Sequence, residues 1–95
     1  MEFLIIARDG TDGQALERRM KMREAHLESA RKMKADGTFL EGGAILDDSG
    51  KMIGSMMLVD FPTEKDMRKW LQSDPYVIGN VWQDIEVTQF KRAPL

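Results

Sequence analysis

The sequence predicts an α+β fold: one four-stranded antiparallel sheet with two helices packed on one of its faces. Short apolar or alternating runs and two helix-period stretches follow one another in the order strand, helix, strand, strand, helix, strand. The turn Asp47-Asp48-Ser49-Gly50 joins the two middle strands as a hairpin, because Gly50 is free to take positive φ. With one crossover helix in each half, this order is the split βαβ, or ferredoxin-like, arrangement.

The first half of the chain supplies the first strand and the longer helix. The apolar run Phe3–Ala7 predicts a buried strand. The turn that follows offers Thr11 or Asp12 as the cap of a helix. That helix runs from Ala15 to about Ala35, and Gly37 supplies a residue suited to the left-handed conformation at its end.

The second half supplies the remaining three strands and the shorter helix. Residues Thr38–Leu46 and Met52–Phe61 predict the two strands of the hairpin. Thr63 is expected to cap the second helix, and Asp74-Pro75 ends it because the residue before proline avoids helical geometry. Residues Trp82–Lys91 predict the last strand, with apolar and polar side chains on alternate faces.

Length and composition limit the classes of protein. Ninety-five residues make one domain, residues 1–95, and 42% hydrophobic with 32% charged residues is typical of a globular chain. A net charge of −2 argues against binding to nucleic acid or to an anionic membrane. The first residues lack the basic start of a signal peptide, and no stretch reaches the ~20 apolar residues of a membrane span. We therefore expect a soluble, cytoplasmic protein.

The strands carry apolar residues at adjacent positions, so both faces of the sheet need cover. Leu4 lies next to Ile5, and the run Met56–Leu58 has three apolar residues in succession. Successive side chains of a strand point to opposite faces, and the two helices cover only one face. A second copy packed sheet to sheet would cover the other face. The sequence therefore predicts a homodimer, with further assembly left open.

The candidate functional residues begin with His26, the only histidine. When Ala15–Lys34 is projected at about 100° per residue, Arg19, Arg23 and His26 fall within the apolar arc of the helix. An unpaired charge is costly to bury, so each of these residues needs a partner. A histidine titrates near neutral pH, which suits general acid–base catalysis. The alternative is a buried histidine that is hydrogen-bonded for structure.

Asp74 is the candidate partner of His26, because both helices are expected on the same face of the sheet. Its carboxylate would fix the imidazole tautomer. Asp74 before Pro75 is also a good N-cap, and both roles are compatible if one oxygen caps while the other meets His26. Arg23 is expected either to hold an anionic substrate or to pair with a buried carboxylate. Tyr76 either lines the mouth of a pocket or packs, whereas Arg19 is expected to serve structure and to extend outward.

Other chemistries lack the residues they need. One histidine and no cysteine do not make a usual zinc site, and the absence of cysteine also removes disulfides and thiol nucleophiles. Asp47-Asp48 lacks the spaced ligands of a calcium loop. No glycine-rich phosphate loop is present, and no serine lies in a nucleophile elbow. We expect no metal and no cofactor.

Several stretches together resemble the YCII-related (YciI-like) family of the dimeric α/β-barrel superfamily. They are Arg23–Leu27, Gly37–Gly43, Leu46–Gly50 with Gly54-Ser55, and Ser73–Val77 with Gly79. The resemblance implies a ferredoxin-like subunit, a sheet-to-sheet dimer, and a pocket between helix and sheet with a His–Asp pair, here His26 and Asp74. Two departures are Glu24, where the family often has proline, and a first strand without the tyrosine common there.

The resemblance also implies the class of reaction. We expect cofactor-independent proton-transfer chemistry on a small organic acid, of lyase type such as dehydrochlorination or of isomerase type. His26 would be the base and Asp74 its orienting partner, with Arg23 and Tyr76 contacting the substrate. The alternative is a non-catalytic dimer that binds a small ligand. A third reading is an accessory domain that acts through protein contacts.

Overall fold

The computed structural model describes all 95 residues, and its elements follow the order expected from the sequence with one addition, a short helix at Pro75–Ile78. Four strands and three helices are present, the third helix being a single turn. Their bounds are β1 Glu2–Asp9, α1 Ala15–Asp36, β2 Phe39–Leu46, β3 Met52–Asp60, α2 Glu64–Ser73, α3 Pro75–Ile78 and β4 Trp82–Phe90.

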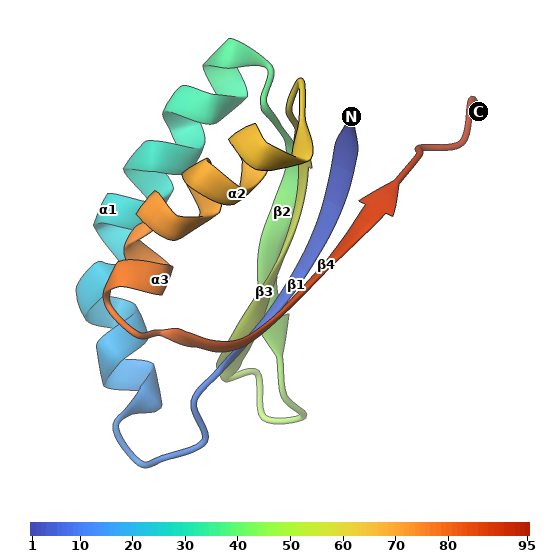
Figure 1. Cartoon of the computed structure of the whole chain (residues 1–95). Helices are drawn as coiled ribbons and strands as arrows, with labels where there is room; N and C mark the ends of the chain where they lie inside the picture. The colour runs from blue at the N-terminus through green and yellow to red at the C-terminus, as the bar shows by residue number, and fades with distance from the viewer.

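The strands form one sheet in the order β2-β3-β1-β4, and all three neighbouring pairs are antiparallel. All three helices lie on one face of this sheet, and the opposite face carries no helix (Figure 1). The predicted α+β, ferredoxin-like arrangement is therefore confirmed. Because α1 and the α2–α3 segment share a face, residues of α1 and of the α2–α3 junction can meet above the sheet.

The two ends of α1 differ in how their backbone groups are satisfied. The predicted cap is wrong: Gln14 is the N-cap residue and makes no side-chain cap bond. The Asp12 carboxylate accepts the Gln14 N–H and two bonds from Arg18 instead, and these bonds hold the pKa of Asp12 well below its usual range. The predicted end is confirmed, because Gly37 is left-handed at φ 81° and its N–H donates to the Lys34 carbonyl.

The junction between α2 and α3 is built from two caps. Thr63 caps α2 as predicted, since its side chain accepts the Asp66 N–H at 3.1 Å. Asp74 has an extended backbone conformation between the two helices, and its side chain accepts the Tyr76 N–H at the start of α3. The N-cap role proposed for Asp74 from the sequence is thus present. The cap bond holds the Asp74 carboxylate on the side of the helices that faces the sheet.

The core lies between the helices and the sheet. Alternate residues of the central strands point into it, namely Phe3, Ile5, Met57 and Val59. They pack against the inner sides of the helices, where Met33, Met67 and Leu71 are buried. The buried residues of α1 form one narrow stripe spaced by four and seven residues. Met20 directly follows Arg19, about 100° around the helix, so it lies outside this stripe and is half exposed at 50%.

Candidate functional site

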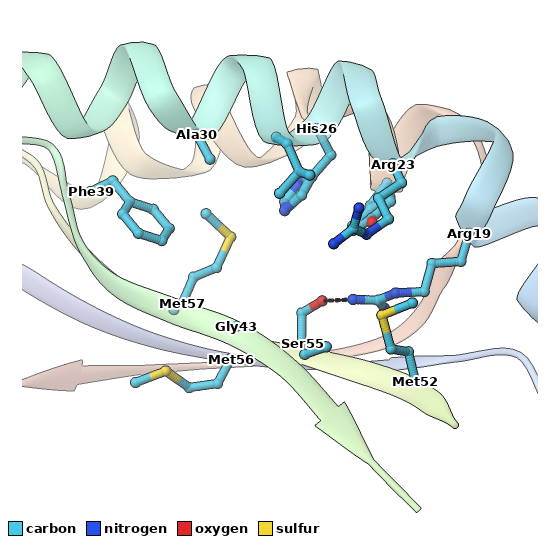
Figure 2. A pocket seen from close by; sticks show the side chains of 14 residues that line it. Arg19, Arg23, His26, Ala30, Phe39, Gly43, Met52, Ser55, Met56 and Met57 are labelled. Atoms are coloured by element: carbon cyan, nitrogen blue, oxygen red, sulfur yellow. Dashed lines mark hydrogen bonds between the residues drawn. The ribbon is translucent and has the colours of Figure 1, made fainter. Parts of the chain in front are cut away.

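A cavity of about 150 Å³ lies between α1 and strands β2 and β3. Arg19, Arg23 and His26 project from α1 toward the sheet and line it (Figure 2). The spacing of four and three residues keeps these side chains on one side of the helix. Phe39 and Met57 contribute to the apolar part of the wall. The residues that the sequence placed on the inner side of α1 are therefore brought into one cavity.

A glycine lets the ring of Phe39 cover one end of the cavity. A Cβ on Gly42 would lie 2.7 Å from the Phe39 ring and 2.8 Å from the Met56 carbonyl oxygen. Both distances are shorter than van der Waals contact, so a side chain at this position would displace the ring or the neighbouring strand. A pair of glycines within a strand is typical of a bulge or of the close approach of another backbone. Both occur here, since the register of β2 shifts between Phe39 and Glu41 and the Met56 carbonyl lies close to Gly42.

His26 and Asp74 are in contact, although 48 residues separate them in sequence. The Nδ1 atom of His26 lies 2.9 Å from Asp74 Oδ1 and 3.2 Å from Oδ2, and both side chains are buried. The same Oδ1 accepts the Tyr76 N–H at 2.9 Å. One oxygen therefore caps α3 while the other meets His26, as expected, and the capping oxygen Oδ1 in addition makes the shorter contact with the histidine.

This contact fixes which nitrogen of the imidazole is free. A carboxylate only accepts hydrogen bonds, so Nδ1 carries the proton in the neutral ring. The other nitrogen, Nε2, then carries a lone pair, and it makes no hydrogen bond within the protein. Because His26 lines the cavity, the free nitrogen is the group it can offer to a ligand there.

Two aromatic rings hold the imidazole plane. The Tyr76 ring is stacked on His26 with centroids 4.0 Å apart and an interplanar angle of 13°, and Trp82 meets His26 edge-on at 5.6 Å. Burial raises the pKa of the Tyr76 phenol, and the nearby guanidinium groups of Arg19 and Arg23 oppose that rise. Tyr76 is therefore a neutral ring that both packs against His26 and lines the cavity.

Arg19 is buried, so the expectation that it extends outward is wrong. Its Nη1 donates to both carboxylate oxygens of Asp9 at 3.0 and 3.1 Å, and its Nη2 donates to Ser55 Oγ at 2.8 Å. Asp9 is the last residue of β1 and points to the helix side. Burial raises the pKa of Asp9, and the charge and hydrogen bonds of Arg19 work against this rise. Arg19 points inward because its guanidinium stabilises the buried Asp9 carboxylate.

Arg23 has no carboxylate partner and makes no hydrogen bond within the protein. The alternative that it pairs with a buried carboxylate is thus not realised, since Arg19 fills that role. Arg23 lies along the same side of α1 between Arg19 and His26, and its guanidinium projects toward the cavity (Figure 2). It is half-buried. Its charge and donors are available to an anionic ligand.

Sequence reasoning missed three residues of this site. The expected first strand ended at Ala7 and left Asp9 outside it, Trp82 was named only as the start of the last strand, and Ser55 only within the Gly54-Ser55 stretch that resembles the family. A signal for Ser55 does exist: it precedes Met57 and Val59 at a spacing of two, so it is a polar residue at an inward position of β3. The same alternation from Phe3 through Ala7 reaches Asp9.

The structure contains no group of three or more histidine, cysteine, aspartate or glutamate side chains placed to hold a metal ion. None of the helices combines the length and the apolar character that crossing a membrane requires.

Comparison with known proteins extends over almost the whole chain. The model of the YCII-related domain matches residues 1–91. The protein YciI of Escherichia coli O6:H1 is 30% identical over 97% of this chain and 98% of its own length. An uncharacterised protein of Haemophilus influenzae is 31% identical over the same shares. The matches therefore span these relatives nearly from end to end.

Two solved structures have the same fold. One is the 5-chloro-2-hydroxyhydroquinone dehydrochlorinase TftG of Burkholderia phenoliruptrix AC1100, in complex with 2,5-dihydroxybenzoquinone. Its TM-score is 0.85 at 24% identity, with 98% of this chain and 96% of that chain covered. The other is an antibiotic biosynthesis monooxygenase, with a TM-score of 0.59 at 14% identity and 97% and 99% of the two chains covered.

Proposed function

The chain belongs to the YCII-related family, and we propose that it is a small enzyme that uses His26 as a general base on a single-ring organic acid. The observation that carries this proposal is the geometry of the histidine. Its Nδ1 is held by the buried Asp74 carboxylate at 2.9 Å, and its Nε2 is free beside a cavity. A general base needs a lone pair within reach of the substrate and a partner that stabilises the imidazolium.

In the proposed reaction, His26 Nε2 removes an acidic proton from the bound ring. The electron pair left behind moves into the ring, and a leaving group such as chloride departs with its own bonding pair. The overall change is loss of HX, which needs no oxidant or reductant. In the isomerase variant of the reaction the imidazolium returns the proton to another atom of the substrate. Asp74 stabilises the imidazolium, and Arg23 holds the negative charge of the substrate.

The size of the cavity supports a ligand with one ring. The cavity measures about 150 Å³, and apolar cavities of roughly 150 Å³ in proteins bind benzene. TftG, which has the same fold, is a dehydrochlorinase in complex with 2,5-dihydroxybenzoquinone, a compound with one six-membered ring. The proposal transfers the ring size and the lyase-type reaction to this chain, and the assay below tests both.

We also propose that the enzyme is a homodimer formed through the open face of the sheet. Apolar side chains of the central strands point to this face, among them Leu4 and Ile6, which are partly exposed, and no helix covers them (Figure 1). Ile6 lies opposite Met56 on β3, near the middle of the sheet. A second copy packed face to face would bury these side chains.

The dimer is tested by sedimentation equilibrium of the wild type and of Ile6→Lys. The wild type should sediment at twice the chain mass of 10.9 kDa, and a lysine in the buried interface should give the monomer. Gln72→Lys, on the exposed side of α2, is the matched control and should leave the dimer intact. A wild-type mass of one chain would refute this part of the proposal.

The enzyme reading is tested by chloride release from 5-chloro-2-hydroxyhydroquinone, with binding of 2,5-dihydroxybenzoquinone measured in parallel by calorimetry. The wild type should release chloride, and His26→Gln should lose about 10²–10⁴-fold in rate while it still binds the quinone. A wild type that binds the quinone without turning over the chlorinated ring would refute the lyase assignment. The non-catalytic ligand-binding module would then take its place.

A further inference from the structure

Ser55 lies in the wall of the cavity, at an inward position of the central strand β3. Its side chain is buried, with 3% of the residue exposed, and it lines the same cavity as Arg23 and His26. Figure 2 shows it on the sheet side, opposite the basic residues of α1. The proposed mechanism does not use this hydroxyl. Its hydrogen bonds, however, restrict what it can offer to a ligand.

Two groups that can only donate meet the oxygen of Ser55. The Arg19 guanidinium donates to Ser55 Oγ at 2.8 Å, and the indole N–H of Trp82 donates to it at 3.2 Å. A hydroxyl oxygen has two acceptor lone pairs and one hydrogen, and neither a guanidinium nor an indole N–H can accept. Both lone pairs of Ser55 are therefore occupied. The hydroxyl hydrogen remains, and it has no acceptor within the protein.

Both donors are held in place by other contacts. Arg19 is fixed by its two bonds to the Asp9 carboxylate, and Trp82 is buried with its ring against Tyr76 and His26. Rotation of the Ser55 hydroxyl toward either donor would break one of these bonds and leave a buried N–H unpaired, which costs about 1–3 kcal/mol. The network thus makes Ser55 a hydrogen-bond donor and prevents it from acting as an acceptor.

We propose that Ser55 is a specificity-determining residue that donates a hydrogen bond to a lone-pair oxygen of the ligand, such as a carbonyl, carboxylate or phenolate oxygen. Arg23 is also a donor only, so His26 Nε2 is the acceptor that the cavity offers opposite these two donors. The ligand class is then a single ring that carries an acceptor oxygen for Ser55 and Arg23 and an acidic hydrogen for His26. The inference rests on the proposed function only in taking this cavity as the ligand site.

Selectivity between a ring with acceptor oxygens and a ring without them tests this proposal. The probes are benzoate, which has acceptor oxygens, and toluene, which has a methyl group in their place. Affinities are measured by ligand-detected NMR for the wild type, Ser55→Ala, Ser55→Thr and the matched control Ser29→Ala on α1. Melting temperatures, measured for all four proteins, set an assay temperature at which each is folded. Turnover is not required, so the result does not depend on whether His26 is catalytic.

The wild type and Ser29→Ala should prefer benzoate to toluene. Ser55→Ala should lose about tenfold or more in affinity for benzoate, with its affinity for toluene unchanged, and Ser55→Thr should retain the preference. An equal loss for both probes in Ser55→Ala would reduce Ser55 to a structural role and overturn the proposal. A wild type that binds toluene as tightly as benzoate would also overturn it, while leaving the His26 assay untouched.

Neutron diffraction from wild-type crystals in D₂O tests the same point without any substitution. The deuterium on Ser55 Oγ should point into the cavity, with the deuterium atoms of Arg19 Nη2 and Trp82 Nε1 directed at the serine oxygen. A Ser55 deuterium directed at an acceptor of the protein would overturn the proposal.

Discussion

Helix α1 carries two buried pairs on its inner side, and they differ in what they leave free. In one pair Arg19 binds Asp9, and in the other His26 binds Asp74. The basic residues are seven positions apart, so they lie two turns from each other on the same side of the helix. Both pairs remove a carboxylate and a basic group from water. Burial and pairing alone therefore do not distinguish a structural pair from a functional one.

The difference lies in the hydrogen-bonding capacity that remains. Arg19 uses both of its terminal nitrogens, on Asp9 and Ser55, and only its buried Nε–H has no partner within the protein. His26 uses only Nδ1, so Nε2 is left facing the ligand space. Arg23 lies between them with all of its donors unused. A candidate site in this protein is thus marked by unused donors and acceptors that line a cavity.

The largest expected effect comes from breaking the pair of Arg19 with Asp9. Arg19→Met leaves the Asp9 carboxylate buried without its cation, and the free energy of unfolding should fall by about 3–5 kcal/mol. Urea denaturation measures this loss. The double variant Arg19→Met/Asp9→Leu removes both charges and should recover most of it. A double variant no more stable than Arg19→Met would mean that the loss comes from packing and not from the unpaired carboxylate.

Replacement of Asp74 separates its two roles. Asparagine is as good an N-cap as aspartate, so Asp74→Asn should keep the bond to the Tyr76 N–H but lose the negative charge beside His26. Turnover should fall by about 10²-fold or more, with little change in stability. Asp74→Ala should lose the same activity and in addition about 0.5–2 kcal/mol of stability with the cap. Equal activity of Asp74→Asn and wild type in the chloride assay would contradict the role of Asp74 as partner of the base.

Arg23→Met is the direct counterpart of Arg19→Met on the same helix. Because Arg23 has no partner in the protein, its loss should change the free energy of unfolding by no more than about 0.5 kcal/mol. The affinity for 2,5-dihydroxybenzoquinone should fall about tenfold or more, since a hydrogen bond to a charged group contributes about 1.5–3 kcal/mol. Urea denaturation and calorimetry measure the two effects. A large loss of stability with unchanged affinity would place Arg23 in the same class as Arg19.

The fold could be predicted because its signals are local. The alternation of the strands, the helix-ending Gly37 and the hairpin turn each act within a few residues. The structure has Gly37 and the turn where the sequence indicated and the strands within two residues of their expected bounds. The contact of His26 with Asp74 followed from placing both helices on one face of the sheet. The resemblance to the family supported the same pair.

The network around Ser55 could not be predicted, because it depends on distant residues and on one strand end. The partners of Ser55 lie 36 and 27 positions away in sequence. No local sequence pattern therefore predicts these hydrogen bonds. The inward turn of Arg19 depends on Asp9, and β1 was expected to end at Ala7. Two further residues of strand place Asp9 on the same face as Phe3, Ile5 and Ala7. An error of two residues at a strand end thus reversed the expected direction of a buried arginine.

The smallest expected effect comes from breaking the exposed salt bridge between Asp12 and Arg18, the residue before Arg19. Hydrogen bonds from Arg18 hold the pKa of Asp12 well below its usual range. A carboxylate with a lowered pKa in the folded state contributes its full stabilisation above its unfolded pKa of 3.8, and this contribution decreases below that value until the pH passes the folded pKa. Asp12→Asn should therefore lower the melting temperature slightly at pH 6 and by less near pH 2. The contribution of Asp9 to stability depends on pH in the opposite direction. Burial raises the pKa of Asp9, so its protonation at low pH favours the folded state. If Asp12→Asn lowered the melting temperature equally at both pH values, the Asn would be acting on the turn before α1, and the charge of Asp12 would have no part in it.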